Sequence, residues 1–202
     1  MKLALAVFSL FSELGSSIKN ALYDRRLIKP RRAPIPVISV GNISLGGTEK
    51  TPLAMELLTC LAALGRRPAL VSRGYKGRWE KRGGVLSDGR SIFGTWQDGG
   101  DEPYLAAITH PAAGVYVGKN RLASCRLAAE AGFDIAVLDD GFQHRRLARD
   151  VDIVLYSSKE KTALRERPSA LLRSDIVLVR CGEEGSRAIE RRRGRLKGRL
   201  FT

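Results

Sequence analysis

The sequence is poor in the residues that build disulfides, metal centres and base-stacking surfaces. Only 6% of its 202 residues are aromatic, and it contains two histidines and three cysteines. The cysteines, Cys60, Cys125 and Cys181, lie far apart and form no CxxC pair. This spacing predicts neither a disulfide framework nor a structural metal site, and it suits a reducing compartment such as the cytosol.

Long apolar runs are missing as well. The apolar stretch at residues 3–11 is followed by Glu13, whereas a membrane-spanning helix needs about 20 residues. Leucines and other apolar residues recur from Leu3 to Leu22, and basic residues follow up to Arg32. This pattern favours an amphipathic helix lying on an anionic membrane surface. The alternative is a helix packed on the protein core with a solvated basic end.

Acidic residues are scarce relative to basic ones. The chain has 21 Asp and Glu against 35 Lys and Arg, which gives a formal net charge of +14. Such a charge indicates an anionic partner: a nucleic acid, an acidic membrane or a phosphorylated substrate. With 44% hydrophobic residues, a chain of this length can bury one good α/β core.

From residue 34 onward, apolar runs alternate with helical patterns, as in a mostly parallel sheet flanked by helices. Residues 76–100 contain many glycines and no long apolar run, so we expect a loop or small hairpin there. Strands are expected at residues 35–40, 68–72, 114–117, 134–139, 151–156 and 175–179, and helices at 51–64, 102–109, 119–131 and 168–173.

A glycine-containing stretch between the first strand and the first helix reads as a phosphate-binding loop. Its last two residues fit the roles of phosphate-binding lysine and Mg²⁺-binding hydroxyl. Glu49 does not fit, because a carboxylate about 4 Å from a phosphate charge costs about 4 kcal/mol at an effective dielectric near 20. The alternative is a polar turn that binds nothing. The loop consists of Ser44, Leu45, Gly46, Gly47, Thr48, Glu49, Lys50 and Thr51.

Three further groups of residues carry chemistry. Asp139 and Asp140 end an apolar strand, where they could hold Mg²⁺ beside the phosphate loop or merely cap the next turn. Asp101 precedes Glu102 and Pro103; it is either a general base that orients an attacking hydroxyl or the N-cap of a helix. His144 could donate a hydrogen bond near the acidic pair or be a structural polar residue.

Taken together, five ordered motifs between residues 20 and 180 resemble the tetraacyldisaccharide 4′-kinase family. They are residues 36–42 with the loop up to Pro52, Ser72-Arg73-Gly74-Tyr75, Gly100-Asp101-Glu102-Pro103, residues 139–144, and Arg149-Asp150. The resemblance implies a P-loop kinase that transfers the γ-phosphoryl group of ATP to the 4′-hydroxyl of tetraacyldisaccharide 1-phosphate, a lipid A precursor. It also implies a peripheral enzyme at the cytoplasmic face of the bacterial inner membrane.

Carried over by that resemblance, Lys50 binds the nucleotide phosphates, Thr51, Asp139 and Asp140 hold Mg²⁺, and Asp101 is the general base. The chain departs from the family at Glu49, where the family has glycine, and between Tyr156 and Arg165, where most of a family segment is missing. The family also continues past the position of Thr202 into a smaller domain, so we expect a truncated kinase with weakened nucleotide binding.

We therefore expect a membrane-surface segment at residues 1–33, a P-loop kinase core at 34–182 and a basic segment at 183–202. Two alternatives to an active kinase remain. One is an inactive, membrane-associated relic of the kinase. The other is a basic P-loop nucleic-acid-binding protein, which the charge and Arg191-Arg192-Arg193 favour. The low aromatic content and the lack of a nucleic-acid-binding motif argue against it, so no nucleic-acid partner is expected.

Overall fold

The computed structural model describes residues 22–23, 25, 27–44, 49–156 and 164–179, and the backbone of 199–201. Three expectations of the sequence fall wholly or mainly outside these residues. They are the amphipathic helix before Leu22, the loop residues 45–48 and the basic stretch 187–198. The division of the chain into three parts stays a prediction.

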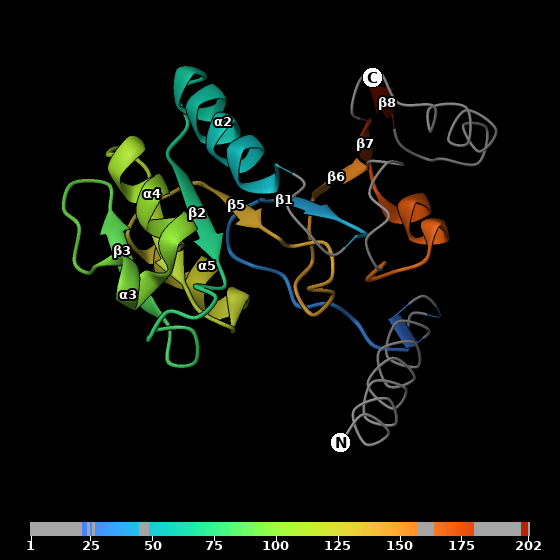
Figure 1. Cartoon of the computed structure of the whole chain (residues 1–202), viewed down its shortest axis with the longest axis horizontal. Coiled ribbons are helices and arrows are strands. Elements are labelled where there is room, and N and C mark those ends of the chain that lie inside the picture. Colours follow the sequence, from blue (N-terminus) through green and yellow to red (C-terminus); the bar gives the residue numbers. More distant parts are fainter. Residues whose placement is uncertain are drawn as a thin grey trace.

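Within the described residues, eight strands form one sheet in the order β3-β4-β2-β5-β1-β6-β7-β8 (Figure 1). Neighbouring strands are parallel except β3, which pairs antiparallel with β4 at one edge. The strands are β1 (Val37–Asn42), β2 (Pro68–Ser72), β3 (Gly84–Asp88), β4 (Gly114–Val117), β5 (Ile135–Asp139), β6 (Val151–Tyr156), β7 (Ile176–Val179) and β8 (Arg199–Phe201).

Helices cover both faces of this sheet. They are α2 (Lys50–Ala63), α3 (Trp96–Gly99), α4 (Asp101–Thr109), α5 (Arg121–Glu130) and the short 3₁₀ helix η1 (Pro168–Arg173). On one face, α2 and α4 bury Leu58 and Ala106 against Leu70 and Val137. The α/β class predicted from the alternating pattern is confirmed.

The opposite face is covered by α5. Its Leu122 and Cys125 pack against Val71 and Leu138, the strand residues next to those that face α2 and α4. Because successive residues of a strand point to opposite faces, a strand covered on both sides must be apolar throughout. This requirement explains why the central strands read as continuous apolar runs in the sequence.

Helix α2 begins with Lys50 and Thr51, the last two residues of the phosphate loop, and is stopped by a glycine that follows it. Pro52 lies in the first turn, where its missing N–H leaves no hydrogen bond unmade. At the other end Gly65 adopts a positive φ of 74°, its N–H donates to Ala62, and the N–H of Arg66 donates to Leu61. This pair of bonds is the Schellman arrangement, which stops the helix and sends the chain into β2.

The structure corrects the sequence prediction in residues 76–100. This segment was expected to be a loop or small hairpin, and it does fold back, since Ser87 bridges Ile92. It also contributes β3 to the main sheet and the short helix α3. The strand escaped detection because only Val85 and Leu86 are apolar and its pairing partner, β4, lies about thirty residues further along the chain.

The other predicted elements follow the expectation closely; β8 was not predicted, since it lies in the stretch 183–202 that was expected to be only a basic segment. Strands at 68–72, 114–117 and 151–156 have the predicted bounds, and the other predicted strands and helices shift by one or two residues at their ends. The predicted helix at 168–173 is a 3₁₀ helix. No helix in the described part of the chain combines the length and the apolarity needed to span a membrane.

Candidate functional site

The candidate site lies where β1 and β5 end. These strands are parallel neighbours, and Val40 of β1 is in register with Asp139 of β5. Because parallel strands end at the same edge of a sheet, the phosphate loop after β1 and the acidic pair after β5 come together there. Lys50 and Thr51, the last residues of the loop, form the start of α2.

Thr51 and Asp139 contact each other directly. The buried Thr51 hydroxyl donates to the Asp139 carboxylate, with Oγ1 3.4 Å from Oδ1 and 3.3 Å from Oδ2. Burial, followed by the nearby charges of Glu102 and Asp140, raises the pKa of Asp139 to about 6, although Lys50 and Thr51 act in the opposite direction. A carboxylate held this far from water beside other acids favours a bound cation.

Asp140 points to a different set of partners. Its carboxylate accepts two hydrogen bonds from Arg165 Nη1, at 2.7 and 3.0 Å, and lies 3.7 Å from Lys50 Nζ. Its backbone has a positive φ of 52°. The two predicted metal ligands therefore diverge, Asp139 toward Thr51 and Asp140 toward the two cations.

Glu49 adopts a left-handed backbone conformation, with φ 55° and ψ 26°, at the residue that precedes α2. A residue with a Cβ adopts this conformation at a cost that glycine avoids. The side chain is exposed and lines the same cavity as Lys50 and Thr51. The position thus retains the torsion for which a glycine is suited, with a carboxylate added.

These residues face a cavity of about 970 Å³. Asp101 and Glu102 line it from the start of α4, and Arg165 lines it from the segment before η1. Asp101 is the first residue of α4, and Gly100, with φ 92°, occupies the N-cap position. The alternative that Asp101 is the N-cap is therefore wrong, because the helix begins one residue earlier than the sequence suggested.

Two predicted site residues lie away from the cavity lining. Ser44 is buried and accepts a hydrogen bond from the Asn42 side chain at 3.2 Å. His144 is not among the described residues that line the cavity; it belongs to the turn that follows Asp140. Loop residues Leu45, Gly46, Gly47 and Thr48 lie outside the described part of the chain, so their predicted role is not tested.

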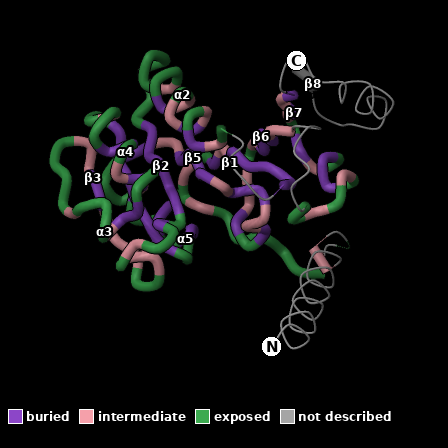
Figure 2. Tube along the Cα trace, viewed as in Figure 1, coloured by how far each residue is buried: buried purple, intermediate pink, exposed green. Residues whose placement is uncertain are grey.

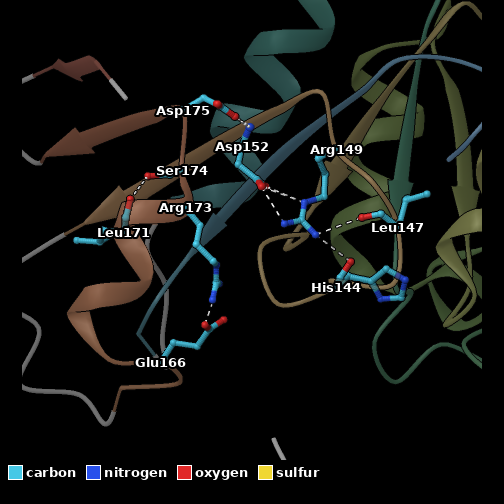
Figure 3. A network of polar contacts seen from close by, with 9 residues as sticks. All are labelled: His144, Leu147, Arg149, Asp152, Glu166, Leu171, Arg173, Ser174 and Asp175. Atoms are coloured by element: carbon cyan, nitrogen blue, oxygen red, sulfur yellow. Dashed lines mark hydrogen bonds and ion pairs between the residues drawn. The ribbon is translucent and has the colours of Figure 1, made fainter. Parts of the chain in front are cut away.

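The turn that contains His144 is held by a largely buried arginine side chain, that of Arg149 (Figure 3). Arg149 donates through Nη1 to the carbonyls of His144 and Leu147, and through Nε and Nη2 to the Asp152 carboxylate at 2.8 to 3.0 Å. Asp175 in turn accepts the backbone N–H of Asp152. This network ties the turn after the acidic pair to β6.

Several residues that line the cavity had no role predicted from the sequence. Glu102 and Arg165 are the two nearest to the predicted site, and Arg73, Tyr75 and Lys76 line the cavity from the loop after β2. The guanidinium of Arg73 and the ammonium of Lys76 lie 5.9 and 5.4 Å from the centre of the Tyr75 ring. For Glu102, Arg73 and Tyr75, membership of the family motifs was the available signal, but a motif does not by itself say which side chains meet.

The residues present suit a nucleotide and Mg²⁺. Thr51, Asp139 and Asp140 offer hydroxyl and carboxylate oxygens, the ligands that Mg²⁺ takes together with water and phosphate. Lys50, largely buried, and Arg165 supply positive charge on the same side of the cavity. Within the described residues, no cluster of three His, Cys, Asp or Glu side chains forms a metal cage.

These features define the class of P-loop nucleotide-binding proteins. The class has a mostly parallel sheet with both faces covered, and a lysine and a threonine that begin a helix beside aspartates at the end of a strand. The crystal structure of the "apo" form of LpxK from Aquifex aeolicus in complex with ATP has this fold. It superposes with a TM-score of 0.79 at 33% identity, over 98% of this chain and 61% of that one.

The family model described as "Tetraacyldisaccharide-1-P 4'-kinase" (LpxK) matches residues 1–200, and this chain belongs to that family. Among its relatives, the tetraacyldisaccharide 4'-kinase of Syntrophus aciditrophicus is 44% identical over 190 residues, covering 89% of this chain and 51% of the relative. That of Pelobacter propionicus is 42% identical over 188 residues, covering 88% and 52%. The chain spans about half the length of these curated relatives.

Proposed function

We propose that this chain carries the nucleotide-binding and phosphoryl-transfer site of a tetraacyldisaccharide 4′-kinase. The reaction moves the γ-phosphoryl group of ATP to the 4′-hydroxyl of tetraacyldisaccharide 1-phosphate, at the cytoplasmic face of the inner membrane. The observation that carries the proposal is the contact of the Thr51 hydroxyl with Asp139, at a cavity that Lys50 and Asp101 also line. Family membership supports it.

In this proposal some cavity residues bind the nucleotide and Mg²⁺, and others act on the acceptor hydroxyl. Lys50 and the loop amides bind the phosphates, and Thr51, Asp139 and Asp140 hold Mg²⁺, which when bound offsets negative charge on the transferred group. Asp101 accepts the proton of the 4′-hydroxyl while the hydroxyl oxygen bonds to phosphorus and the bond to the ADP oxygen breaks. His144 is assigned a hydrogen bond near the acidic pair.

Transfer of label from γ-labelled ATP to the purified acceptor in detergent micelles tests the proposal. We expect Mg²⁺-dependent labelling that Lys50→Ala abolishes and Arg126→Ala, a change at an exposed arginine outside the cavity lining, leaves unchanged. Nucleotide binding without transfer, in the wild type and in Glu49→Gly alike, supports the inactive relic instead. Failure of both proteins to bind nucleotide overturns the proposal.

The nucleic-acid alternative is separated from the proposal by a binding assay with plain oligonucleotides. The net charge of +14 alone gives weak, strongly salt-dependent binding. Tight binding that survives physiological salt, together with no transfer to the acceptor, favours that alternative. None of the comparisons with known proteins points to it.

A further inference from the structure

Two neighbouring segments beside the cavity expose an unusual number of large apolar side chains. The first is residues 73–82, which follow β2, and the second is residues 90–97, which connect β3 to α3. Tyr75 is 66% exposed, Phe93 58%, Trp96 53% and Ile92 44%. Tyr75 and Trp96 also line the cavity. We refer to these two segments together as the aromatic-basic rim.

The two segments are packed against each other, so the rim is one surface. The backbone N–H of Arg78 donates to the carbonyl of Gln97 at 2.9 Å, and that of Trp79 to the carbonyl of Asp98 at 3.0 Å. The Trp79 ring lies against Gly94, where a Cβ would come within 2.6 Å of it. Both segments are largely exposed on the side of the molecule where β3 and α3 lie (Figure 2).

The rim is also strongly basic. Residues 73–97 contain six Lys and Arg and two Asp and Glu. All six basic residues are exposed, whereas Glu80 is paired with Arg73 at 2.6 Å and Asp88 accepts backbone N–H groups of its own turn. Since the acids are occupied locally, the surface presents excess positive charge around its apolar side chains.

We propose that the aromatic-basic rim is a second membrane-contact surface, which rests on an anionic bilayer and opens the cavity toward it. The inference rests on the proposed function, because an acylated acceptor must be drawn from the bilayer. Trp and Tyr side chains prefer the membrane–water interface, and flanking Lys and Arg are attracted to anionic headgroups. Nucleic acid fits less well: its bases could stack on Phe93, whereas an aliphatic side chain such as Ile92 gains more from the apolar region of a bilayer.

The position of Tyr75 and Trp96 gives this surface a function beyond anchoring. Both side chains belong at once to the rim and to the cavity lining. A headgroup entering the cavity would therefore leave its acyl chains close to the bilayer, at the apolar edge. Asp101 and Glu102 lie at the same cavity.

The two tryptophans of the chain, Trp79 and Trp96, allow a direct test. Trp79→Phe leaves Trp96 as the sole tryptophan, and Trp96→Phe is the matched control, which leaves the partly buried Trp79. The full chain is mixed with vesicles of phosphatidylglycerol and phosphatidylcholine in equal parts, carrying brominated acyl chains. We expect a blue shift and strong quenching of Trp96, much less change at Trp79, and loss of both effects with purely phosphatidylcholine vesicles.

A second pair of variants tests the apolar contribution without touching the cavity. Ile92→Ser with Phe93→Ser should weaken co-sedimentation with the anionic vesicles several-fold. Leu64→Ser with Leu127→Ser, at exposed leucines just after α2 and on α5, should not.

Unchanged Trp96 emission in protein that co-sediments with vesicles means that another part of the chain makes the contact, and it overturns the inference. Absence of vesicle binding also overturns the inference, and it would indicate that the aromatic-basic rim binds a protein partner instead. Because neither readout needs ATP or acceptor, a chain that contacts vesicles yet transfers no phosphate contradicts only the proposed function.

Discussion

Glu49 is unfavourable in two ways, through its backbone conformation and through the charge of its side chain. Its left-handed backbone costs roughly 1–2 kcal/mol relative to glycine, and its carboxylate lines the cavity in which the nucleotide phosphates are proposed to bind. We expect Glu49→Gly to tighten binding of a non-hydrolysable Mg·ATP analogue at least about tenfold, since each 1.4 kcal/mol is a factor of ten. Calorimetric titration of both proteins measures the difference.

Glu49→Ala serves as the matched control, because it removes the charge and keeps the unfavourable torsion. Its affinity should fall between those of the wild type and Glu49→Gly. Equal affinities in all three proteins would mean that the carboxylate points away from the phosphates and that the loop accepts the torsion at no cost.

Asp139 should make the stability of the metal-free protein depend on pH. Its pKa rises from 3.8 to about 6 on folding, so ionisation above about pH 6 opposes folding by about 3 kcal/mol, and the penalty disappears below about pH 4. Asp139→Asn should therefore be more stable than the wild type near neutral pH, and the advantage should shrink as the pH falls through this window. Urea unfolding without Mg²⁺ tests this, and a constant difference would contradict it.

Asp101 should matter for turnover and little for nucleotide affinity, because a general base acts on the acceptor. If the chain is active, Asp101→Asn should lower the rate by about 10²- to 10⁴-fold while ATP affinity stays nearly constant. Glu102→Gln, the neighbouring cavity residue, is the comparison. Wild-type turnover in Asp101→Asn would assign the base to another group.

At the scale of single residues, the sequence identified the residues proposed to bind phosphate and metal and missed Arg165, which lines the same cavity. Lys50, Thr51 and Asp139 were predictable because a loop between strand and helix and the end of a neighbouring strand must meet. Arg165 was not, since it pairs with Asp140 across twenty-five positions and follows residues 157–163, which the structure does not describe. The divergence of Asp139 from Asp140 depends on the positive φ of Asp140, which an Asp-Asp pair does not reveal.

Between β5 and β6, the Arg149–Asp152 pair holds the turn after the acidic pair. Both side chains are about nine-tenths buried. We expect Arg149→Ala to destabilise the protein by about 3 kcal/mol or more, because it leaves the Asp152 charge buried without its cation. Urea unfolding compares it with Arg126→Ala, a change at an exposed arginine of α5. A loss as small as that of the control would mean that water replaces the guanidinium.

The bounds of helices and strands were predicted most accurately where the element is fully buried. Strands β2 and β4 are buried at every position, so their apolar runs mark their bounds directly. Strand β3 begins with a glycine at the sheet edge, only its Leu86 and Ser87 are buried, and its pairing with β4 is long-range. Residues 168–173 contain a helix-favouring run, but the short segment between Arg167 and Ser174 closes as a 3₁₀ helix.

For the molecule as a whole, two separate surfaces are expected to share membrane binding. Deleting residues 1–26 removes most of the amphipathic segment and keeps Arg31, whose backbone bonds to Arg146 and Ala148. We expect the truncated chain to bind anionic vesicles more weakly than the full chain and to retain the binding of the aromatic-basic rim. Co-sedimentation at low and high salt measures both contributions, with neutral vesicles as the control. Unchanged binding would remove the N-terminal segment from the interaction.

The central position of β1 also has a consequence for the order of folding. Val37 is in register with Ala136, and Ile38 with Val151, so both neighbours of β1 come about a hundred residues later in the chain. During synthesis this apolar strand must wait for β5 and β6, and closing such long loops before any pairing is gained is slow. The phosphate loop and the acidic pair are therefore assembled late, in a step that completes the middle of the sheet and the site together.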